Sequence, residues 1–220
     1  MDTAEFSLTG DLAPGMKLNK AKVLKRGKFG QLVTFFASRK NNCSVACETL
    51  LEADFCFYLE RWPGISAYCS QPFSLQLIDE DISYTPDFLA RRIDGTPILF
   101  EVKSASGAQC ASWEQRRSVL EYAFGIRHIA YEVIGESDVR SGAELDNLRY
   151  LYFVGFDGDS EGDRHVEALL STRPNRRSSI AEMIRSGVSE QAIAHALFHD
   201  AIHTDLSLII NLESLIWSNP

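Results

Sequence analysis

Residues 84–103 read YTPDFLARRIDGTPILFEVK, and this stretch decides how the rest of the chain is interpreted. Two segments rich in apolar residues flank Asp94-Gly95, a dipeptide that is common in the turns of β-hairpins. Asp87 lies at the start of the first segment, whereas Glu101 and Lys103 lie at the end of the second. The sequence therefore predicts two antiparallel strands that carry their charged side chains at the same end.

These side chains suit the metal-dependent hydrolysis of a phosphodiester. Such hydrolysis uses a hard cation that polarises the phosphoryl oxygen and lowers the pKa of the attacking water, and Mg²⁺ prefers oxygen ligands. Asp87 and Glu101 supply carboxylates, and the Val102 carbonyl can add an oxygen. Glu101 and Lys103 share one face of the strand, where Lys103 can orient water or stabilise charge on the phosphate. We predict a Mg²⁺ (or Mn²⁺) site here, although an exposed ion pair would give the same short motif.

The loop of this hairpin decides whether the two carboxylates meet. A two-residue turn at Asp94-Gly95 would direct the Asp87 side chain to the face opposite Glu101. A three-residue loop over residues 94–96, with the glycine in the left-handed conformation, returns both carboxylates to one face. A bulge at Pro86 has the same effect, because proline cannot donate to the ladder. We expect one of these two irregularities.

The flanking sequence predicts an α/β fold in the order helix, three strands, helix, strand. Apolar residues at three- and four-residue spacing indicate helices, and β-branched or alternating stretches indicate strands. We expect these elements at about the following positions: a helix at residues 44–60, an antiparallel meander at 65–78, 82–90 and 97–102, a helix at 109–124 and a strand at 126–134.

Two glutamates on the first expected helix are further candidates for the site. Glu48 and Glu52 are four residues apart and share a helix face, so either can be a third metal ligand. Both can equally be ordinary charges on the solvent side of an amphipathic helix.

A Gly/Asp-rich break at residues 155–163 indicates a boundary between two domains. We therefore divide the chain into a flexible lead-in (1–20), a catalytic domain (21–160) and a C-terminal domain (164–220).

The C-terminal domain has the pattern of a helix-turn-helix. A helix is expected at 178–185 and a tight turn at 186–188, before Ser189 caps a second helix that reaches about His199. The tail, residues 202–217, is expected to fold back as a wing, or as a last strand and helix. The second helix carries no lysine or arginine, so a protein-docking role is as well supported as DNA reading. His195, His199 and His203 recur every fourth residue but lack matching acidic or cysteine ligands, so they are interpreted as surface or domain-packing histidines rather than metal ligands.

Composition limits what the protein can do unaided. The formal net charge of −8 argues against a protein that grips nucleic acid alone, because non-specific DNA affinity comes mainly from basic residues that neutralise phosphates. The N-terminal region is nevertheless basic, which leaves open a DNA-facing surface or a merely solvated one. The candidate DNA contacts are Lys25, Arg26, Lys28, Arg39 and Lys40.

The cellular environment is also suggested by composition. Five cysteines without paired CxxC spacing favour free thiols in a reducing compartment. No apolar stretch is long enough for a membrane span. We therefore expect a cytoplasmic protein without a membrane partner.

Together these motifs resemble the TnsA endonuclease subunit of heteromeric transposons, including the CRISPR-associated ones. The resemblance spans about residues 20–155 and depends on the following segments, which occur in the same order: Phe36-Ala37-Ser38-Arg39-Lys40, residues 47–55, Ser70-Gln71-Pro72-Phe73, Pro86-Asp87, Glu101-Val102-Lys103, residues 131–134, residues 137–140 and Asn147-Leu148. Their combination is far more specific than any single motif.

The resemblance implies a PD-(D/E)xK restriction-endonuclease-like core, a central mixed sheet flanked by helices, and a small C-terminal winged-helix-like domain. It assigns the catalytic helix carboxylate to Glu52 rather than Glu48, with Glu52 as a metal ligand beside Asp87 and Glu101, and Lys103 as the catalytic lysine. It implies cleavage of the non-transferred strands at transposon ends in double-stranded DNA. The implied partners are a TnsB-like DDE transposase, which would supply the DNA grip, and a TnsC-like AAA ATPase.

Two alternatives stay open. The same chemistry fits a stand-alone restriction or repair nuclease, which genes for a transposase and an ATPase beside this one would argue against. A catalytically inactive subunit that bridges the transposase and the ATPase is disfavoured, because such a subunit could lose any one of Glu52, Asp87, Glu101 and Lys103, and all four are present.

Overall fold

The computed structural model describes residues 15–20 and 33–219 of the chain. It divides into two compact units. The first unit comprises Met1–Glu60 and Gly64–Val139, and the second comprises Arg61–Pro63 and Arg140–Pro220. None of the helices within the described ranges combines the length and apolar character needed to cross a bilayer.

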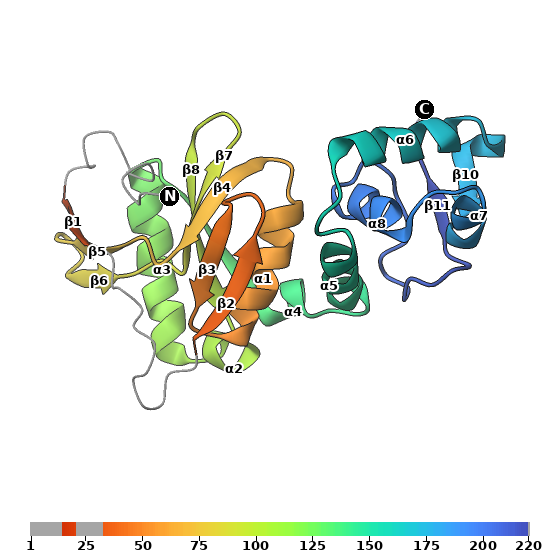
Figure 1. The fold of residues 1–220 in the computed structure, drawn as a ribbon. Coiled ribbons are helices and arrows are strands. Elements are labelled where there is room, and N and C mark those ends of the chain that lie inside the picture. The colour runs from red at the N-terminus through yellow and green to blue at the C-terminus, as the bar shows by residue number, and fades with distance from the viewer. Residues whose placement is uncertain (1–14, 21–32, 220) are drawn as a thin grey trace. The chain divides into compact units, whose positions relative to one another are not determined.

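The first unit is a mixed α/β structure (Figure 1). Its elements are β1 (Met16–Lys20), β2 (Thr34–Ser38), β3 (Cys43–Cys47), α1 (Leu50–Arg61), β4 (Ile65–Ser70), β5 (Phe73–Leu77), β6 (Ile82–Tyr84), β7 (Phe88–Arg92), β8 (Pro97–Lys103), α2 (Ala105–Ala108), α3 (Ala111–Ile126), β9 (Ala130–Gly135) and α4 (Glu136–Val139).

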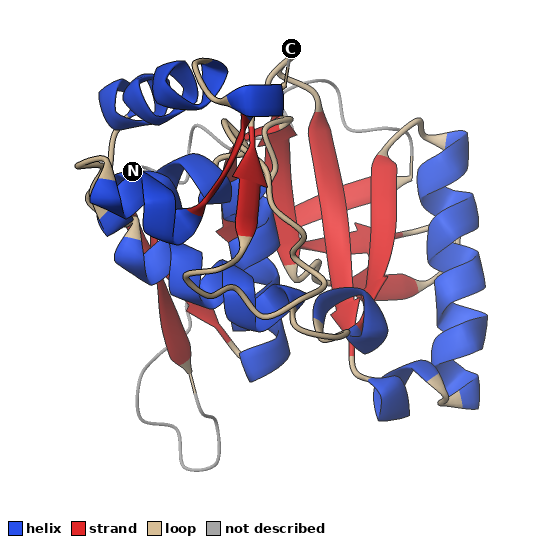
Figure 2. Ribbon diagram, turned by 90° about the vertical axis from the view of Figure 1, so that its right-hand side faces the viewer, coloured by secondary structure: helices blue, strands red, loops and turns tan. Residues whose placement is uncertain are grey.

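A four-stranded mixed sheet forms the centre of this unit, in the order β4-β7-β8-β9. The first three strands are antiparallel neighbours, whereas β9 is parallel to β8. The helix α3 lies between β8 and β9 in the chain, as a parallel crossover requires. Figure 2 shows the strands side by side with helices at their flanks. The expected order of helix, three strands, helix and strand therefore holds for α1, α3 and the strands of this sheet, although β5 and β6 also lie between α1 and α3 in the chain.

The two faces of the sheet bury different side chains. Phe88 and Phe100 lie opposite each other and both contact Phe55 of α1. The alternate positions Leu89 and Leu99 belong to the cluster that α3 completes with Leu120, Phe124 and their neighbours. Because side chains alternate along a strand, residues 87, 101 and 103 point to the α3 face.

The expected helix at residues 44–60 begins too early. Cys43–Cys47 forms the strand β3, which pairs with β2, and α1 starts only at Leu50. Val45 and Cys47 are buried while Ala46 between them is more exposed, which is a strand pattern. The helical spacing of the apolar residues after position 50 made the sequence look helical from Ser44 onward. Thr49 marks the helix start, because its side-chain oxygen accepts a hydrogen bond from the Glu52 N–H at 3.1 Å.

The lead-in and the expected meander also differ from the prediction. Residues 16–20, assigned to a flexible lead-in, form β1, which pairs with β5 and buries Met16. Residues 1–14 lie outside the described part of the chain. The stretches 65–78 and 82–90 are each divided into two strands, because β5 and β6 leave the central sheet and form a separate sheet in the order β1-β5-β6. Gln71, with a positive φ of 42°, lies at the first division.

The second unit consists mainly of helices. Its elements are α5 (Glu144–Val154), α6 (Ser160–Ser171), η2 (Pro174–Arg176), β10 (Arg177–Ser179), α7 (Ile180–Arg185), α8 (Glu190–Phe198) and β11 (Leu215–Trp217). The strands β10 and β11 are antiparallel, and His203 forms an isolated bridge with Trp217. The tail therefore ends in a strand that pairs back onto the unit.

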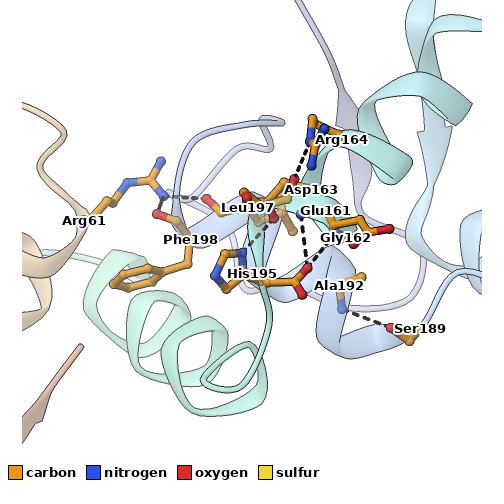
Figure 3. A network of polar contacts seen from close by, with 12 residues as sticks. Arg61, Glu161, Gly162, Asp163, Arg164, Ser189, Ala192, His195, Leu197 and Phe198 are labelled. Carbon is orange, nitrogen blue, oxygen red and sulfur yellow. Dashed lines mark hydrogen bonds and ion pairs between the residues drawn. The ribbon is translucent and has the colours of Figure 1, made fainter. Parts of the chain in front are cut away.

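The two helices and the turn expected between residues 178 and 199 are observed as α7, the turn after it and α8. Ser179 and Glu182 form a capping box at the start of α7, and Gly187 in the turn has a φ of 92°, which favours glycine. The Ser189 side chain caps α8 by accepting from the Ala192 N–H (Figure 3).

The helix α8 lies at the core of the second unit. Both α5 and α6 pack against it, and five of its nine residues are buried. His195 on α8 contacts Asp163 on α6, with 2.7 Å between Nδ1 and Oδ1 (Figure 3). Adding a Cβ at Gly155 or Gly158 would place it within 2.6 Å of His195 atoms, so both glycines permit this close packing.

This packing moves the boundary between the units. The sequence suggested a division at residues 155–163, but α5 precedes that break and packs on α8. The break is only the short connection between α5 and α6, where Asp159 caps α6. The catalytic domain expected at 21–160 therefore ends structurally at Val139.

Candidate active site

The hairpin of β7 and β8 places Asp87 and Glu101 on one face. The register pairs Phe88 with Phe100 and Arg91 with Pro97, so by extension Asp87 lies opposite Glu101. The loop has three residues and Gly95 has a φ of 85°, as expected for the glycine. The loop residues are 93–95 rather than 94–96, because the Arg92 N–H bonds to the Thr96 carbonyl. This one-residue shift still leaves both carboxylates on the same face.

The surroundings of the Asp87 carboxylate disfavour its negative charge. Its Oδ2 accepts a hydrogen bond from the Val102 N–H at 2.7 Å. Burial and then the charge of Glu101 raise its pKa to about 8, and Glu52 contributes in the same direction. The Val102 bond and the charge of Lys103 act in the opposite direction, but they do not compensate. A negative charge at Asp87 is therefore unfavourable without an added cation.

Glu101 is held between a phenol and an amine. It is 5% exposed, and its Oε2 accepts a 2.7 Å hydrogen bond from the Tyr84 hydroxyl, while Oε1 forms an ion pair with Lys103 Nζ. Lys103 also lies over the ring of Trp113, 4.6 Å from its centroid. Burial and the Glu101 charge raise the pKa of Tyr84 well above its usual value, so Tyr84 stays a donor.

Glu52 approaches from the first turn of α1 and has a second, structural role. Its carboxylate accepts from the Glu48 N–H at 2.9 Å and from the Thr49 hydroxyl at 3.0 Å. These bonds satisfy groups at the helix start. Burial still raises the pKa of Glu52, and the charge of Glu48 adds to the effect.

Glu48 was left without a role by the resemblance, and the structure gives a reason to consider it. Its Oε1 is buried and has no hydrogen-bond partner among the described residues. A buried carboxylate oxygen without a donor is costly unless a cation or water satisfies it. The N-terminal end of α1 thus places two acidic side chains close together, and one of them is unsatisfied.

The residues present fit a cation of the magnesium class at Asp87 and Glu101. Mg²⁺ is commonly held by one or two carboxylates, with waters and substrate phosphate completing its shell. The raised pKa of Asp87 is the observation that favours a cation there. Within the described ranges, however, no three His, Cys, Asp or Glu side chains are grouped closely enough to hold a metal. Glu52 therefore does not join the pair as a direct ligand in this geometry, and the Val102 carbonyl stays a prediction.

Of the five candidate DNA contacts, the structure describes two, Arg39 and Lys40. Lys25, Arg26 and Lys28 lie outside the described residues. Arg39 is exposed in the turn between β2 and β3. Lys40 is half-buried, its Nζ donates to the Leu59 carbonyl at 2.8 Å, and burial lowers its pKa to about 8.

Lys40 is thus a poor phosphate contact, and it is remote from Glu52. Its backbone N–H donates to Glu60, eight residues beyond Glu52 on α1. That separation is about 12 Å along a helix. The expectation that Lys40 contacts DNA is therefore not supported, because local sequence showed its charge but not its burial.

Several residues that line a cavity beside Glu101 and Lys103 had no role assigned from the sequence. It has a volume of about 430 Å³ and is lined by Tyr84, Thr85, Glu101, Lys103, Gly107, Ser112, Trp113 and Arg116. Tyr84 was part of the quoted motif, two residues before Pro86. Nothing in the sequence distinguished Arg116 from the other charged residues of the helix expected at 109–124.

Comparison with known proteins provides no family assignment. No model of a protein family matches the chain, and no curated protein matches its sequence. The geometry of the residues therefore carries the functional argument.

Proposed function

We propose that the protein is a metal-dependent DNA endonuclease of the PD-(D/E)xK type. The observation that carries the proposal is the position of Asp87 and Glu101 on one face of the β7–β8 hairpin, with Lys103 beside them. The raised pKa of Asp87 favours a cation at this pair. When bound, Mg²⁺ or Mn²⁺ would supply Lewis acidity and lower the pKa of the attacking water.

The protein groups have separable roles in this chemistry. Asp87 and Glu101 are the residues that would hold the cation. Lys103 carries positive charge next to Glu101 and stabilises negative charge that develops on the phosphate. Tyr84 holds one oxygen of Glu101, which orients the carboxylate. Glu52 adds negative potential from α1 and keeps the start of that helix formed.

We assign the enzyme to transposition, as the TnsA-like subunit that cuts non-transferred strands at transposon ends. The ordered motifs of the first unit support this assignment, as does the net charge of −8, which calls for a partner that holds DNA. The partners on this assignment are a TnsB-like DDE transposase and a TnsC-like AAA ATPase. A stand-alone nuclease is the second candidate, and cleavage that needs no partner would favour it.

The second unit suits protein docking better than DNA reading. Its order of α6, β10, α7, α8 and β11 follows that of a winged-helix domain, but α5 and α6 cover α8. A recognition helix must present side chains to a groove. Glu190, near the start of α8, instead accepts a hydrogen bond from Tyr150 of α5.

The test is cleavage by the purified protein with Mg²⁺ or Mn²⁺, with and without the transposase, on DNA that carries transposon ends. Asp87→Asn should reduce cleavage by at least about a thousandfold, or about 4 kcal/mol in activation free energy. Asp94→Asn is the matched control, because Asp94 is exposed in the same hairpin and should leave the rate unchanged. Equal cleavage by Asp87→Asn and wild type would refute the assignment.

A further inference from the structure

The wall of the cavity opposite Glu101 and Lys103 is formed by the first turns of α3. Ser112, Trp113 and Arg116 line it there, whereas Tyr84 and Thr85 line it from the segment around β6. At about 430 Å³, the cavity falls in the size range that small organic ligands occupy. The space next to the reacting groups is therefore large enough for a nucleotide unit of a DNA strand.

Arg116 is the charged group of this wall that remains available to a ligand. It is exposed, and its Nη2 donates to the Ser83 carbonyl at 2.5 Å. A guanidinium has five N–H donors, so this bond fixes the group against β6 and leaves the other donors for an anion. Among the described residues no carboxylate forms an ion pair with Arg116. The next residue, Arg117, is already paired with Glu121 at 2.7 Å.

The charges around the cavity favour a phosphate. Lys103 and Arg116 are cationic, while Glu101 is the one carboxylate in the lining and is already paired with Lys103. Basic side chains outnumber acidic ones in this lining, whereas acidic residues outnumber basic ones in the whole chain, whose net charge is −8. Arginine is well suited to phosphate, because its planar fork can donate two parallel hydrogen bonds.

We infer that Arg116 binds a phosphate next to the scissile one on the strand that is cut, with Ser112 beside it in the cavity. The inference depends on the proposed nuclease function for the identity of the strand. The role assigned to Arg116 is to bind and align the substrate, not to take part in bond cleavage. Neither the sequence motifs nor the resemblance pointed to this residue.

The first test measures DNA binding without chemistry. A fluorescent duplex oligonucleotide is titrated with the full chain in EDTA, at several salt concentrations beginning at low salt. Arg116→Ala should weaken binding about tenfold and reduce the slope of log K against log salt by about one, because one phosphate contact is lost. Arg116→Lys should keep most of the salt slope, because the charge remains.

Arg117→Ala is the matched control on the same helix. It removes an exposed ion pair within α3 that contributes little to stability, and it should bind DNA as the wild type does. Thermal melts should show all three variants folded, because both arginines are exposed. Equal binding and equal salt slope for Arg116→Ala and Arg117→Ala would overturn the inference, and so would a wild type that fails to bind at low salt.

A second test separates this inference from the proposed function. After the wild-type cut position is mapped, the neighbouring phosphates are replaced one at a time by neutral methylphosphonates. One replacement should slow the wild type and have no further effect on Arg116→Ala, as expected when both changes remove the same contact. Additive effects at every position would overturn the inference while cleavage itself still supported the nuclease. The wild type could also bind DNA without ever cutting it. If Arg116→Ala then bound DNA more weakly, the result would support the phosphate contact and contradict the nuclease.

Discussion

Two buried glutamates on the same helix have very different surroundings. Glu60, near the end of α1, is fully buried and accepts hydrogen bonds from Ser38 Oγ, the Lys40 N–H and the Tyr68 hydroxyl. Glu52, in the first turn, is 5% exposed, its pKa is raised, and it faces other carboxylates. Glu60 is satisfied by donors from β2, β4 and the turn after β2, whereas Glu52, although it accepts two local hydrogen bonds, adds to a surplus of negative charge.

The difference distinguishes a structural carboxylate from a functional one. A buried charge that is surrounded by donors connects parts of the fold, and its cost is already compensated. A buried charge among like charges destabilises the unliganded protein and becomes favourable when a cation binds. Burial alone therefore does not identify the site, and the balance of donors around each carboxylate does.

The largest expected effect on stability is at Glu60. Glu60→Ala leaves the hydroxyls of Ser38 and Tyr68 and the Lys40 N–H without an acceptor, so the free energy of unfolding should fall by roughly 3 kcal/mol or more. Urea denaturation would measure the change. Glu60→Gln keeps one acceptor and should lose less. A Glu60→Ala protein as stable as the wild type would show that this cluster does not hold the strands to α1.

Glu52 should behave in the opposite way. Glu52→Gln keeps one acceptor for the helix start, so the loss of stability should be about 1 kcal/mol. Cleavage should fall about a hundredfold, or about 3 kcal/mol, because the negative potential at the cation is reduced. Single-turnover cleavage rates and denaturation curves, measured on the same preparations, separate the two quantities. Thr49→Ala is the control for a purely structural role, and equal rate losses in the two variants would assign Glu52 to capping alone.

A smaller effect should appear in the pH dependence of the metal-free protein. The folded-state pKa of Asp87 is about 8, above its usual value, so its stabilising contribution is fully present below about pH 4 and is lost as the pH rises through 8. Asp87→Asn should therefore be more stable than wild type at pH 8, by on the order of 1 kcal/mol, with a smaller difference at pH 4.

Unfolding curves at several pH values in EDTA would measure this difference. Glu52 is present in both proteins, so the comparison isolates Asp87. Added Mg²⁺ should stabilise the wild type and leave Asp87→Asn nearly unchanged, because ligands stabilise only the state that binds them. A stability difference that does not vary between pH 4 and pH 8 would contradict the electrostatic account.

The sequence by itself determined the features that depend on neighbouring residues. The order of α1, α3 and the central-sheet strands, the glycine in the β7–β8 loop and the Ser189 cap of α8 were predicted from short segments. Turn conformation and capping are set by hydrogen bonds within a few residues, and they leave a direct pattern in the chain. The acidic and basic residues at one end of the hairpin were identified for the same reason.

Only the tertiary structure decided which of those residues have which surroundings. Burial of Lys40 against α1, the departure of β5 and β6 from the central sheet and the covering of α8 by α5 all depend on contacts between distant segments. Residues of β8 and α3 line the cavity together, so Arg116 could be recognised as a candidate phosphate contact only from the packing of these two elements. Desolvation and the charges of distant residues determine the pKa of Asp87, and both are set by packing rather than by local sequence.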